Sequence, residues 1–329
     1  MANIFVDRSF EEVYAKYPVV LVDVGASGGL NRRWERVRKF LRVVGFEPDG
    51  RAFAELGKKG NAGQKFINAA LHHSDGTIRL HLTRNHECSS ILAPNTAFLG
   101  QFPDPGRFDV VGGVDLKATR LTRGVLRKEG IDDVDFLKVD TQGSEYYILQ
   151  GAKDLLNECI FGVEVEVEFS PIYEKQPLFS DVDVLLRGSG FSLFDLKRYF
   201  WRRGKGECSR QGKGQIVFAD ALYLKRYEEF LECIKSLDDV RKKAKIFKAV
   251  SLCLLYGLND YAFYLGDRAA ADRLISTDER GLIMKASSQG RSGVRFKGRG
   301  GLARWLYGLY KHFRCGEFYC ADEELGNEL

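Results

Sequence analysis

A run of apolar residues that ends directly in a glycine-rich turn limits the possible folds of this chain more than any other part of its sequence. The run, Val19–Val24, reads VVLVDV, and the turn at residues 25–29 reads GASGG. A strand that is buried on both faces has such a continuous apolar pattern, and strands of this kind belong to parallel sheets covered by helices. Glycines directly after the strand allow a tight turn into the next element. The sequence therefore predicts an α/β fold built on a parallel sheet.

Strands and helices alternate from this run to about residue 224. We expect further strands at 42–47, 65–71, 77–83, 135–139, 160–167, 191–196 and 215–224, and helices at 1–17, 31–41, 49–59, 120–129, 144–156 and 182–187. Residues 84–107 are polar and interrupted by proline and glycine, so we expect a loop there. This alternation is typical of a mostly parallel sheet with helices on both faces, and we predict one such domain over residues 1–224.

The spacing of apolar residues changes to that of amphipathic helices after residue 224. Segments 227–237, 240–254 and 260–274 carry apolar residues three and four positions apart, with a break at 257–259. We expect a C-terminal all-α extension, a helical hairpin or short bundle, over residues 225–285. Residues 286–329 should then form a Gly/Ser/Arg-rich linker, a short aromatic helix at 302–313 and an acidic tail.

Composition excludes several classes of protein. The longest apolar stretch, residues 250–258, is far shorter than the roughly 18 residues that span a bilayer. The seven cysteines are scattered and none is spaced as CxxC, which argues against a disulfide framework or a zinc ribbon and favours a reducing cytoplasm. The five histidines form no HExxH or HxH pattern, so we expect no dedicated transition-metal site.

The net charge of +5 is concentrated near the C-terminus. Residues 285–314 contain eight basic residues and no acidic one, and an acidic tail follows. Two interpretations stay open: a self-neutralising tail whose aromatic helix docks on the helical extension, or a contact to anionic lipid or a charged glycan. The second predicts a cytoplasmic protein held peripherally at an anionic membrane surface. Nucleic acid is a less favoured partner, because no aromatic-interleaved RNA motif accompanies the charges.

A glycine turn followed by an acid at the end of the second strand is the nucleotide-binding arrangement of open α/β sheets. Here these elements are Asp23, Gly25, Gly28 and Gly29, then Glu47. Glycines let backbone amides approach a charged ligand, and the acid accepts hydrogen bonds from ribose hydroxyls. The turn does not fit GxGxxG, which favours an adenosyl ligand without a pyrophosphate. S-adenosylmethionine is such a ligand, since its positive sulfonium suits Asp23 and its ribose suits Glu47.

A second block of sequence supports the same ligand. Asp140 follows the strand expected at 135–139, at the sheet edge where open α/β proteins hold their chemistry. Together the segments LVDVGASGG, VVGFEPD, INAALHHSDGTIRLHL, SSIL, DFLKVDTQGSEYYILQGA and EVEFSPIYEKQPLF resemble the FkbM-type methyltransferases, class I enzymes dependent on S-adenosylmethionine. The resemblance covers residues 19–200, and FLKVDTQGSE is its most specific piece. It implies a Rossmann-like class I methyltransferase sheet and methylation of a hydroxyl on a glycan, glycolipid or secondary metabolite.

The resemblance also implies roles for individual residues. The turn should hold the methionine side of the cofactor, Glu47 the ribose, residues 68 and 69 the adenine edge, and Asp140 the region of the methyl group. The cofactor-binding residues are thus Asp23, Gly25, Ala26, Gly28, Glu47, Asn68, Ala69 and Asp140. Glu145 matches the acid of the family's G-x-E, although it could equally be a helix-start residue stabilised by the helix dipole. Gly29 departs from the family's more usual polar or aromatic residue.

Methyl transfer to oxygen benefits from a general base or an electrostatic partner beside the hydroxyl. The candidates are Asp140 at the sheet edge, Glu166 on the strand at 160–167, and His86 in the loop at 84–107. Glu166 alternates with Glu164 and Glu168 on one face of a strand expected to be buried, where charges need partners or a task. A salt-bridged structural role for Glu166 and an exposed loop position for His86 therefore stay open.

Two other functions stay open at this point. A nicotinamide-dependent oxidoreductase would need a pyrophosphate-binding GxGxxG and a hydride-transfer dyad, and the sequence shows neither. A non-catalytic adaptor could keep a methyltransferase-like fold while its helices bind a partner, although Asp23, Glu47 and Asp140 are all present. The preferred hypothesis is an S-adenosylmethionine-dependent methyltransferase with a small-molecule or glycan acceptor.

Overall fold

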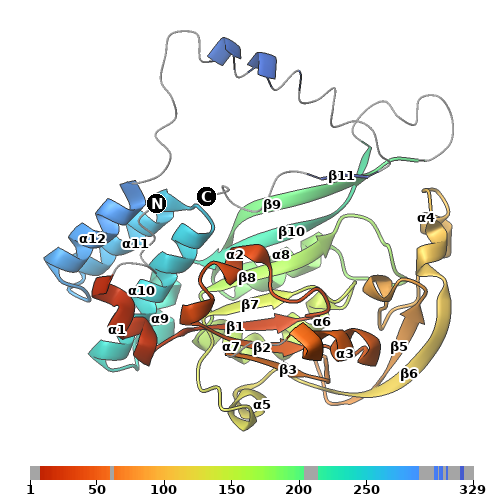
Figure 1. Cartoon of the computed structure of the whole chain (residues 1–329), viewed down its shortest axis with the longest axis horizontal. Coiled ribbons are helices and arrows are strands. Elements are labelled where there is room, and N and C mark those ends of the chain that lie inside the picture. The colour runs from red at the N-terminus through yellow and green to blue at the C-terminus, as the bar shows by residue number, and fades with distance from the viewer. Residues whose placement is uncertain are drawn as a thin grey trace.

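A computed structural model of the chain describes residues 8–59, 63–203, 214–288, 300–302, 304–306, 309 and 319–321. Its centre is an eight-stranded sheet with the strand order β11-β9-β10-β8-β7-β1-β2-β3 (Figure 1). The strands are β1 (Val19–Val24), β2 (Leu41–Phe46), β3 (Gln64–Ile67), β7 (Phe136–Val139), β8 (Gly162–Glu168), β9 (Phe191–Trp201), β10 (Gln215–Lys225) and β11 (Tyr319–Ala321). The strands from β8 to β3 are parallel, and β10, β9 and β11 are antiparallel. The predicted mostly parallel α/β sheet is confirmed.

Helices cover both faces of the sheet, and alternating residues of β1 pack into the two cores. Val19 and Leu21 pack with α1 (Arg8–Lys16) and the C-terminal helices on one face. Val20, Val22 and Val24 pack into the core on the other face. That face carries α5 (Arg123–Lys128), α6 (Glu145–Gly151), α7 (Lys153–Glu158) and α8 (Phe179–Gly188). The apolar run that opens the sheet is continuous because both of its faces are buried.

The predicted all-α extension is present and consists of α9 (Tyr227–Ile234), α10 (Asp239–Leu255), α11 (Asn259–Ala271) and α12 (Thr277–Ser288). Side chains of these four helices share one apolar core with α1, β1 and β2. Helix α10 is buried along nearly all of its length from Ala244 to Leu255. The helices therefore serve as the covering layer of one sheet face. The proposed boundaries at residues 224 and 285 stay a prediction.

The strand expected at 65–71 was wrong as a single element. β3 pairs with β2, and the chain then leaves the main sheet so that β4 (Ala70–Leu71) joins a second sheet of order β4-β6-β5. Its other strands are β5 (Gly76–Thr83) and β6 (Val110–Thr119). β6 was not predicted, because most of its residues are exposed and it lacks a regular apolar face. The loop expected at 84–107 contains short helices: η3 (His86–Cys88), α4 (Thr96–Leu99) and η4 (Pro105–Phe108).

Two predicted helices were also wrong in extent. The segment 31–41 forms only α2 (Arg32–Glu35) and the 3₁₀ turn η2 (Arg38–Phe40) before β2 begins. Val37 N–H donates to Trp34 O and Phe40 N–H to Val37 O, so the three-residue spacing of these buried side chains reflects 3₁₀ geometry. The segment 144–156 divides into α6 and α7 at Ala152. Helix α3 (Gly50–Lys59) agrees with its prediction.

The segment 285–314 lies largely outside the described residues, and so does the acidic tail beyond 321. Of the predicted aromatic helix, Leu302, Trp305, Leu306 and Leu309 are described, and all four are exposed. Within the described part of the chain, no helix is long and apolar enough to cross a membrane.

Candidate active site

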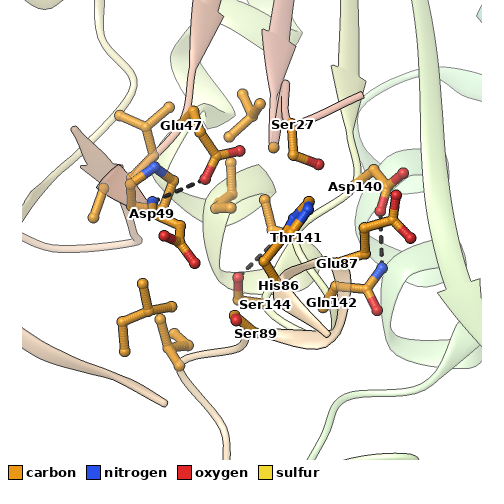
Figure 2. A pocket seen from close by; sticks show the side chains of 18 of the residues that line it. Ser27, Glu47, Asp49, His86, Glu87, Ser89, Asp140, Thr141, Gln142 and Ser144 are labelled. Atoms are coloured by element: carbon orange, nitrogen blue, oxygen red, sulfur yellow. Dashed lines mark hydrogen bonds between the residues drawn. The ribbon is translucent and has the colours of Figure 1, made fainter. Parts of the chain in front are cut away.

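A pocket of about 330 Å³ lies at the carboxyl ends of β1, β2 and β7. The turn at 25–29, residues 47–49 and residues 138–142 form its sheet side, and residues 86–89 of the η3 loop face them (Figure 2). Side chains of β5, including Ile78 and Leu80, close an apolar wall. Ligands of open α/β sheets bind at this edge, and the volume falls within the range of small-molecule sites.

Gly25, the first residue of the glycine turn, lies directly against the backbone of Asp140. Its φ is +82°, and a Cβ at this position would lie 1.7 Å from the carbonyl oxygen of Asp140. The N–H of Asp140 donates to Val24 O at 2.9 Å, which fixes the two backbones at this separation. Only glycine fits there, since both the backbone conformation and the space exclude a side chain. A Cβ at Gly28 or Gly29 would meet no atom within 4 Å, so the other side of the turn is open to a ligand.

Glu47 extends from the end of β2 into the pocket. Its Oε1 accepts a hydrogen bond from the Asp49 N–H at 2.8 Å, and the side chain is almost fully buried. Burial raises the pKa of Glu47 to about 7, against the opposing effect of the Asp49 N–H. Asn68 supports this segment from outside the pocket, because its Nδ2 donates to the backbone oxygen of Glu47 at 2.8 Å. Ala69, beside it, lines the pocket.

Lys138 lies between two acids at the ends of β1 and β7. Its Nζ is 3.4 Å from Asp23 Oδ1 and 3.7 Å from Asp140 Oδ2. Asp23 is buried beneath the pocket and does not line it, whereas Asp140 does. Burial raises the pKa of Asp23, against the charge of Lys138. Lys138 therefore pairs with both strand-end acids, and it links the buried Asp23 to the pocket.

Glu145 holds the turn that follows Asp140. Its carboxylate accepts hydrogen bonds from Thr141 N–H at 2.6 Å and from Gly143 N–H at 2.9 Å. It starts α6 and is 2% exposed. The alternative of a helix-start residue, rather than a ligand contact, therefore describes the geometry of Glu145.

Gln142 connects the pocket to the acids of β8. It adopts a left-handed backbone conformation with φ of 58°. Its Nε2 donates to Asp140 Oδ1 at 3.1 Å and to Glu166 at 3.3 Å, and its Oε1 accepts from the Tyr173 hydroxyl at 3.3 Å. Because both amide hydrogens face carboxylates, the amide has one favourable orientation. Burial, with the nearby charge of Asp140, holds the pKa of Glu166 well above its usual range.

Arg51 fixes the η3 loop, which carries the candidate base His86. Arg51 Nε lies 3.0 Å from Asp49 Oδ1, and Arg51 Nη2 donates to Ser89 Oγ at 3.1 Å. Burial raises the pKa of Asp49, but Arg51 outweighs it and leaves that pKa below its usual range. His86 lies on this loop and lines the pocket. Its Nδ1 is buried without a hydrogen-bond partner among the described residues, which is uncommon for a buried polar atom.

The sequence-predicted residues thus fall into two groups. The pocket is lined by Gly25, Gly28, Glu47, Ala69, His86 and Asp140. Four others, Asp23, Ala26, Asn68 and Glu166, lie beneath or behind it. Sequence reasoning did not select Asp49, Glu87, Ser89 or Gln142, which also line it. Their only sequence signal is position: Asp49 and Gln142 each lie three residues after a strand end, and Glu87 and Ser89 lie in the loop at 84–107.

The charge of the pocket fits a cationic cofactor. Glu47, Asp49, Glu87 and Asp140 line it with Lys138 as the one basic residue among the described lining residues. A sulfonium compound is attracted by such an acidic wall, and the open side of the glycine turn leaves room for its main chain. No group of three or more His, Cys, Asp or Glu side chains placed to hold a metal ion is found in the described part of the chain.

Comparison with known proteins agrees with this geometry. The model of the methyltransferase FkbM domain matches residues 23–193, which contain the glycine turn, Glu47, Asp140 and Glu166. The chain is 26% identical over 215 residues to the methyltransferase sdnD of Sordaria araneosa, covering 58% of this chain and 80% of that protein. It is 25% identical over 196 residues to the 2-O-methyltransferase NoeI of Sinorhizobium fredii, covering 56% and 78%.

Among solved structures, the magnesium protoporphyrin IX methyltransferase of Synechocystis aligns with 67% of this chain and 78% of its own, at 10% identity and a TM-score of 0.33. The family match alone spans more than half of the 329 residues. It includes the pocket's strand-end acids and its glycine turn. The chain therefore belongs to the FkbM methyltransferase family, and its cofactor is S-adenosylmethionine.

Proposed function

We propose that this methyltransferase methylates a hydroxyl oxygen of a small, neutral, polyhydroxylated acceptor, such as a sugar unit of a glycan or glycolipid or a secondary metabolite. The observation that carries the proposal is a set of hydrogen-bond acceptors that line the pocket: His86 and Glu87 on the η3 loop, and Asp140 beside the glycine turn (Figure 2). Hydroxyl groups donate to such acceptors, whereas an anionic acceptor molecule would be repelled by the two carboxylates. The name of the relative NoeI, a 2-O-methyltransferase, supports the same type of reaction.

In this proposal one side of the pocket holds the cofactor and the other side holds the acceptor. The turn at 25–29 and Ala69 contact the cofactor, and Glu47 accepts hydrogen bonds from its ribose. The cofactor supplies an electrophilic methyl group. Asp140 lies between the turn and the η3 loop, so its charge acts where the methyl group and the hydroxyl meet.

His86 is the general base of this proposal. Asp140 already contacts Lys138 and Gln142, and these contacts hold its carboxylate beside the glycine turn. Glu166 does not line the pocket and reaches Asp140 only through the amide of Gln142. His86 offers the buried, unpartnered Nδ1 on the acceptor side. A hydroxyl that donates to this nitrogen can give up its proton as the methyl–oxygen bond forms.

Methyl transfer from S-adenosylmethionine to a panel of acceptors tests the proposal. Methyl glycosides and short neutral oligosaccharides should be methylated on oxygen, and analogues in which amines or carboxylates replace the hydroxyls should not. His86→Gln should lower turnover by about 100-fold or more, which is the usual contribution of a positioned base. His81→Gln, on β5 outside the pocket, is the matched control and should keep its turnover. Amine products, or full turnover in His86→Gln, would refute the assignment.

Attachment of residues 285–314 to an anionic membrane surface, on a cytoplasmic protein, is a separate proposal. The exposure of Trp305 (62%) and Leu306 (51%) supports it, because aromatic and aliphatic side chains beside basic residues are the features of interfacial binding. An acceptor linked to a lipid would then be held close to the enzyme.

A further inference from the structure

A second pocket, of about 750 Å³, lies at the opposite edge of the sheet. It is bounded by residues at the start of β1, by the loop that precedes β7, by the end of α7 and by one side of α9 and α10. The six residues of β1 separate the two edges by roughly 20 Å. Within the described part of the chain, no residue lines both pockets. The second pocket is therefore independent of the cofactor site.

The charge of this pocket is opposite to that of the cofactor pocket. Eight of its lining residues are basic and four are acidic. Several of the basic side chains already have acidic partners, such as Arg123 with Glu158 at 2.7 Å. Two do not: among the described residues, neither Lys16 nor Arg42 has a carboxylate within ion-pair distance. An excess of positive charge therefore remains at its rim.

Arg42 reaches over this rim. The side chain is exposed at the start of β2, and its Nη2 would lie 3.2 Å from a Cβ placed on Gly130, which also lines the pocket. Arg127, on the same side, has only a distant partner, Asp132 at 3.9 Å. Two guanidinium groups and the Lys16 ammonium are therefore available to one bound anion.

The floor of the pocket contains two buried lysines of α10. Lys245 Nζ is saturated, with Asp133, Asp135 and the carbonyl oxygens of residues 134 and 159 between 2.7 and 3.2 Å away. Lys248 is different: among the described residues, its one hydrogen bond goes to Asp135 Oδ2 at 2.9 Å. Its side chain is 6% exposed. An ammonium group has three donors, and buried donors are normally satisfied, so two donors of Lys248 are left for a molecule in the pocket.

We propose that this pocket is a second ligand site, which binds a small soluble anion carrying one or more phosphate groups. Lys248 donates from the floor, and Arg42, Arg127 and Lys16 close on the anion from the rim. Guanidinium groups match the geometry of phosphate oxygens, and ammonium groups add point charges. The depth of Lys248 favours a discrete molecule over a flat charged surface. The ligand would contact both β2 and α10, and so would strengthen the docking of the helical layer on the sheet.

Calorimetric titration of the full chain with pyrophosphate, at constant ionic strength, tests the proposal. Pyrophosphate should bind with one-to-one stoichiometry. Arg42→Gln and Lys248→Met should each weaken binding about tenfold, since each removes a charge-assisted hydrogen bond. Arg36→Gln is the matched control, because Arg36 is an exposed arginine that lines neither pocket. Affinity for S-adenosylmethionine should be unchanged in Arg42→Gln.

Several outcomes would overturn the site. These are no saturable binding at millimolar pyrophosphate, equal affinity in Arg42→Gln and Arg36→Gln, or binding that chloride or sulfate at the same ionic strength abolishes. A parallel binding measurement with vesicles that contain phosphatidic acid tests whether the phosphate group belongs to a lipid. Binding to these vesicles without binding to pyrophosphate would also refute a soluble ligand. If Lys248→Met does not fold, Arg42→Gln still decides the question, since that side chain is exposed.

Discussion

Replacing Gly25 with alanine, beside the same change at Gly28 and Gly29, distinguishes two reasons why the turn needs glycine. These are a left-handed backbone conformation and a close contact with another part of the backbone. Gly25, Gly28 and Gly29 belong to the same turn but differ in structure. Gly25 has positive φ and a Cβ there would lie 1.7 Å from Asp140 O, Gly29 has positive φ with open space, and Gly28 has open space alone. The three alanine variants therefore form a graded series at one site.

The structure sets the expected size of each effect. Gly28→Ala should change the free energy of unfolding by less than about 0.5 kcal/mol. Gly29→Ala should cost roughly 1–2 kcal/mol, the cost of a left-handed conformation for a residue with a Cβ. Gly25→Ala incurs that cost and must also separate the ends of β1 and β7, which is an overpacking of about 1–3 kcal/mol more. The total expected for Gly25→Ala is about 2–5 kcal/mol.

Urea denaturation of the three variants measures this series, and calorimetry measures their affinity for S-adenosylmethionine. Gly25→Ala should be the least stable and should also weaken cofactor binding, because the displaced turn and Asp140 both line the pocket. If Gly25→Ala were as stable as Gly28→Ala, the proposed close contact between the turn and the strand-end acid would be refuted.

Three further predictions concern stability and the C-terminal segment. Asp135→Asn leaves Lys245 and Lys248 buried without their shared carboxylate and should lower the free energy of unfolding, measured by urea denaturation, by about 3–5 kcal/mol. Asp133→Asn is the control, because the Asp133 side chain is 39% exposed, and it should lower this free energy by about 1 kcal/mol or less. The pKa values of Glu47, of Glu145 and of Asp220 on β10 are each raised by burial to about 7, so the folded chain binds these protons more tightly than the unfolded chain does. Stability should therefore fall as pH rises from about 4, near the unfolded pKa values, to about 7. A cofactor-free melting temperature that rises over this interval would contradict the burial of these acids. Flotation with anionic liposomes should be salt-sensitive for the full chain and lost after truncation at residue 288, and equal flotation of both forms would refute membrane binding through the C-terminal segment.

The parts of the fold that depend on local pattern could be predicted from the sequence. The apolar run at Val19–Val24 predicts a strand buried on both faces, and its six residues are all buried. The positions of Glu47 and Asp140 at the pocket could be predicted, because an acid at a strand's carboxyl end has one position relative to the sheet edge. β6 could not be found, since an exposed strand that contains two adjacent glycines has no periodic apolar face.

Contacts between distant segments gave no sequence signal. Nothing near Asp135 indicates that its partners are Lys245 and Lys248, more than 100 positions later and on another element. The same holds for Gln142, whose role depends on Glu166 of β8 and on the Tyr173 hydroxyl. The roles of Asp23 and Glu166 could not be separated from those of pocket residues by spacing alone, because depth below the pocket depends on how the neighbouring strands pack.

Calorimetric titration of S-adenosylmethionine into the wild-type chain and Glu47→Ala tests the central claim most directly. One-to-one binding to the wild type is expected, weakened about tenfold or more in Glu47→Ala, since up to two hydrogen bonds to the ribose are lost at about 0.5–1.5 kcal/mol each. Glu55→Ala, an exposed glutamate of α3, should bind as the wild type does, and NAD should not bind. An unchanged dissociation constant in Glu47→Ala, or binding of NAD in place of S-adenosylmethionine, would contradict the assignment of this pocket as the cofactor site.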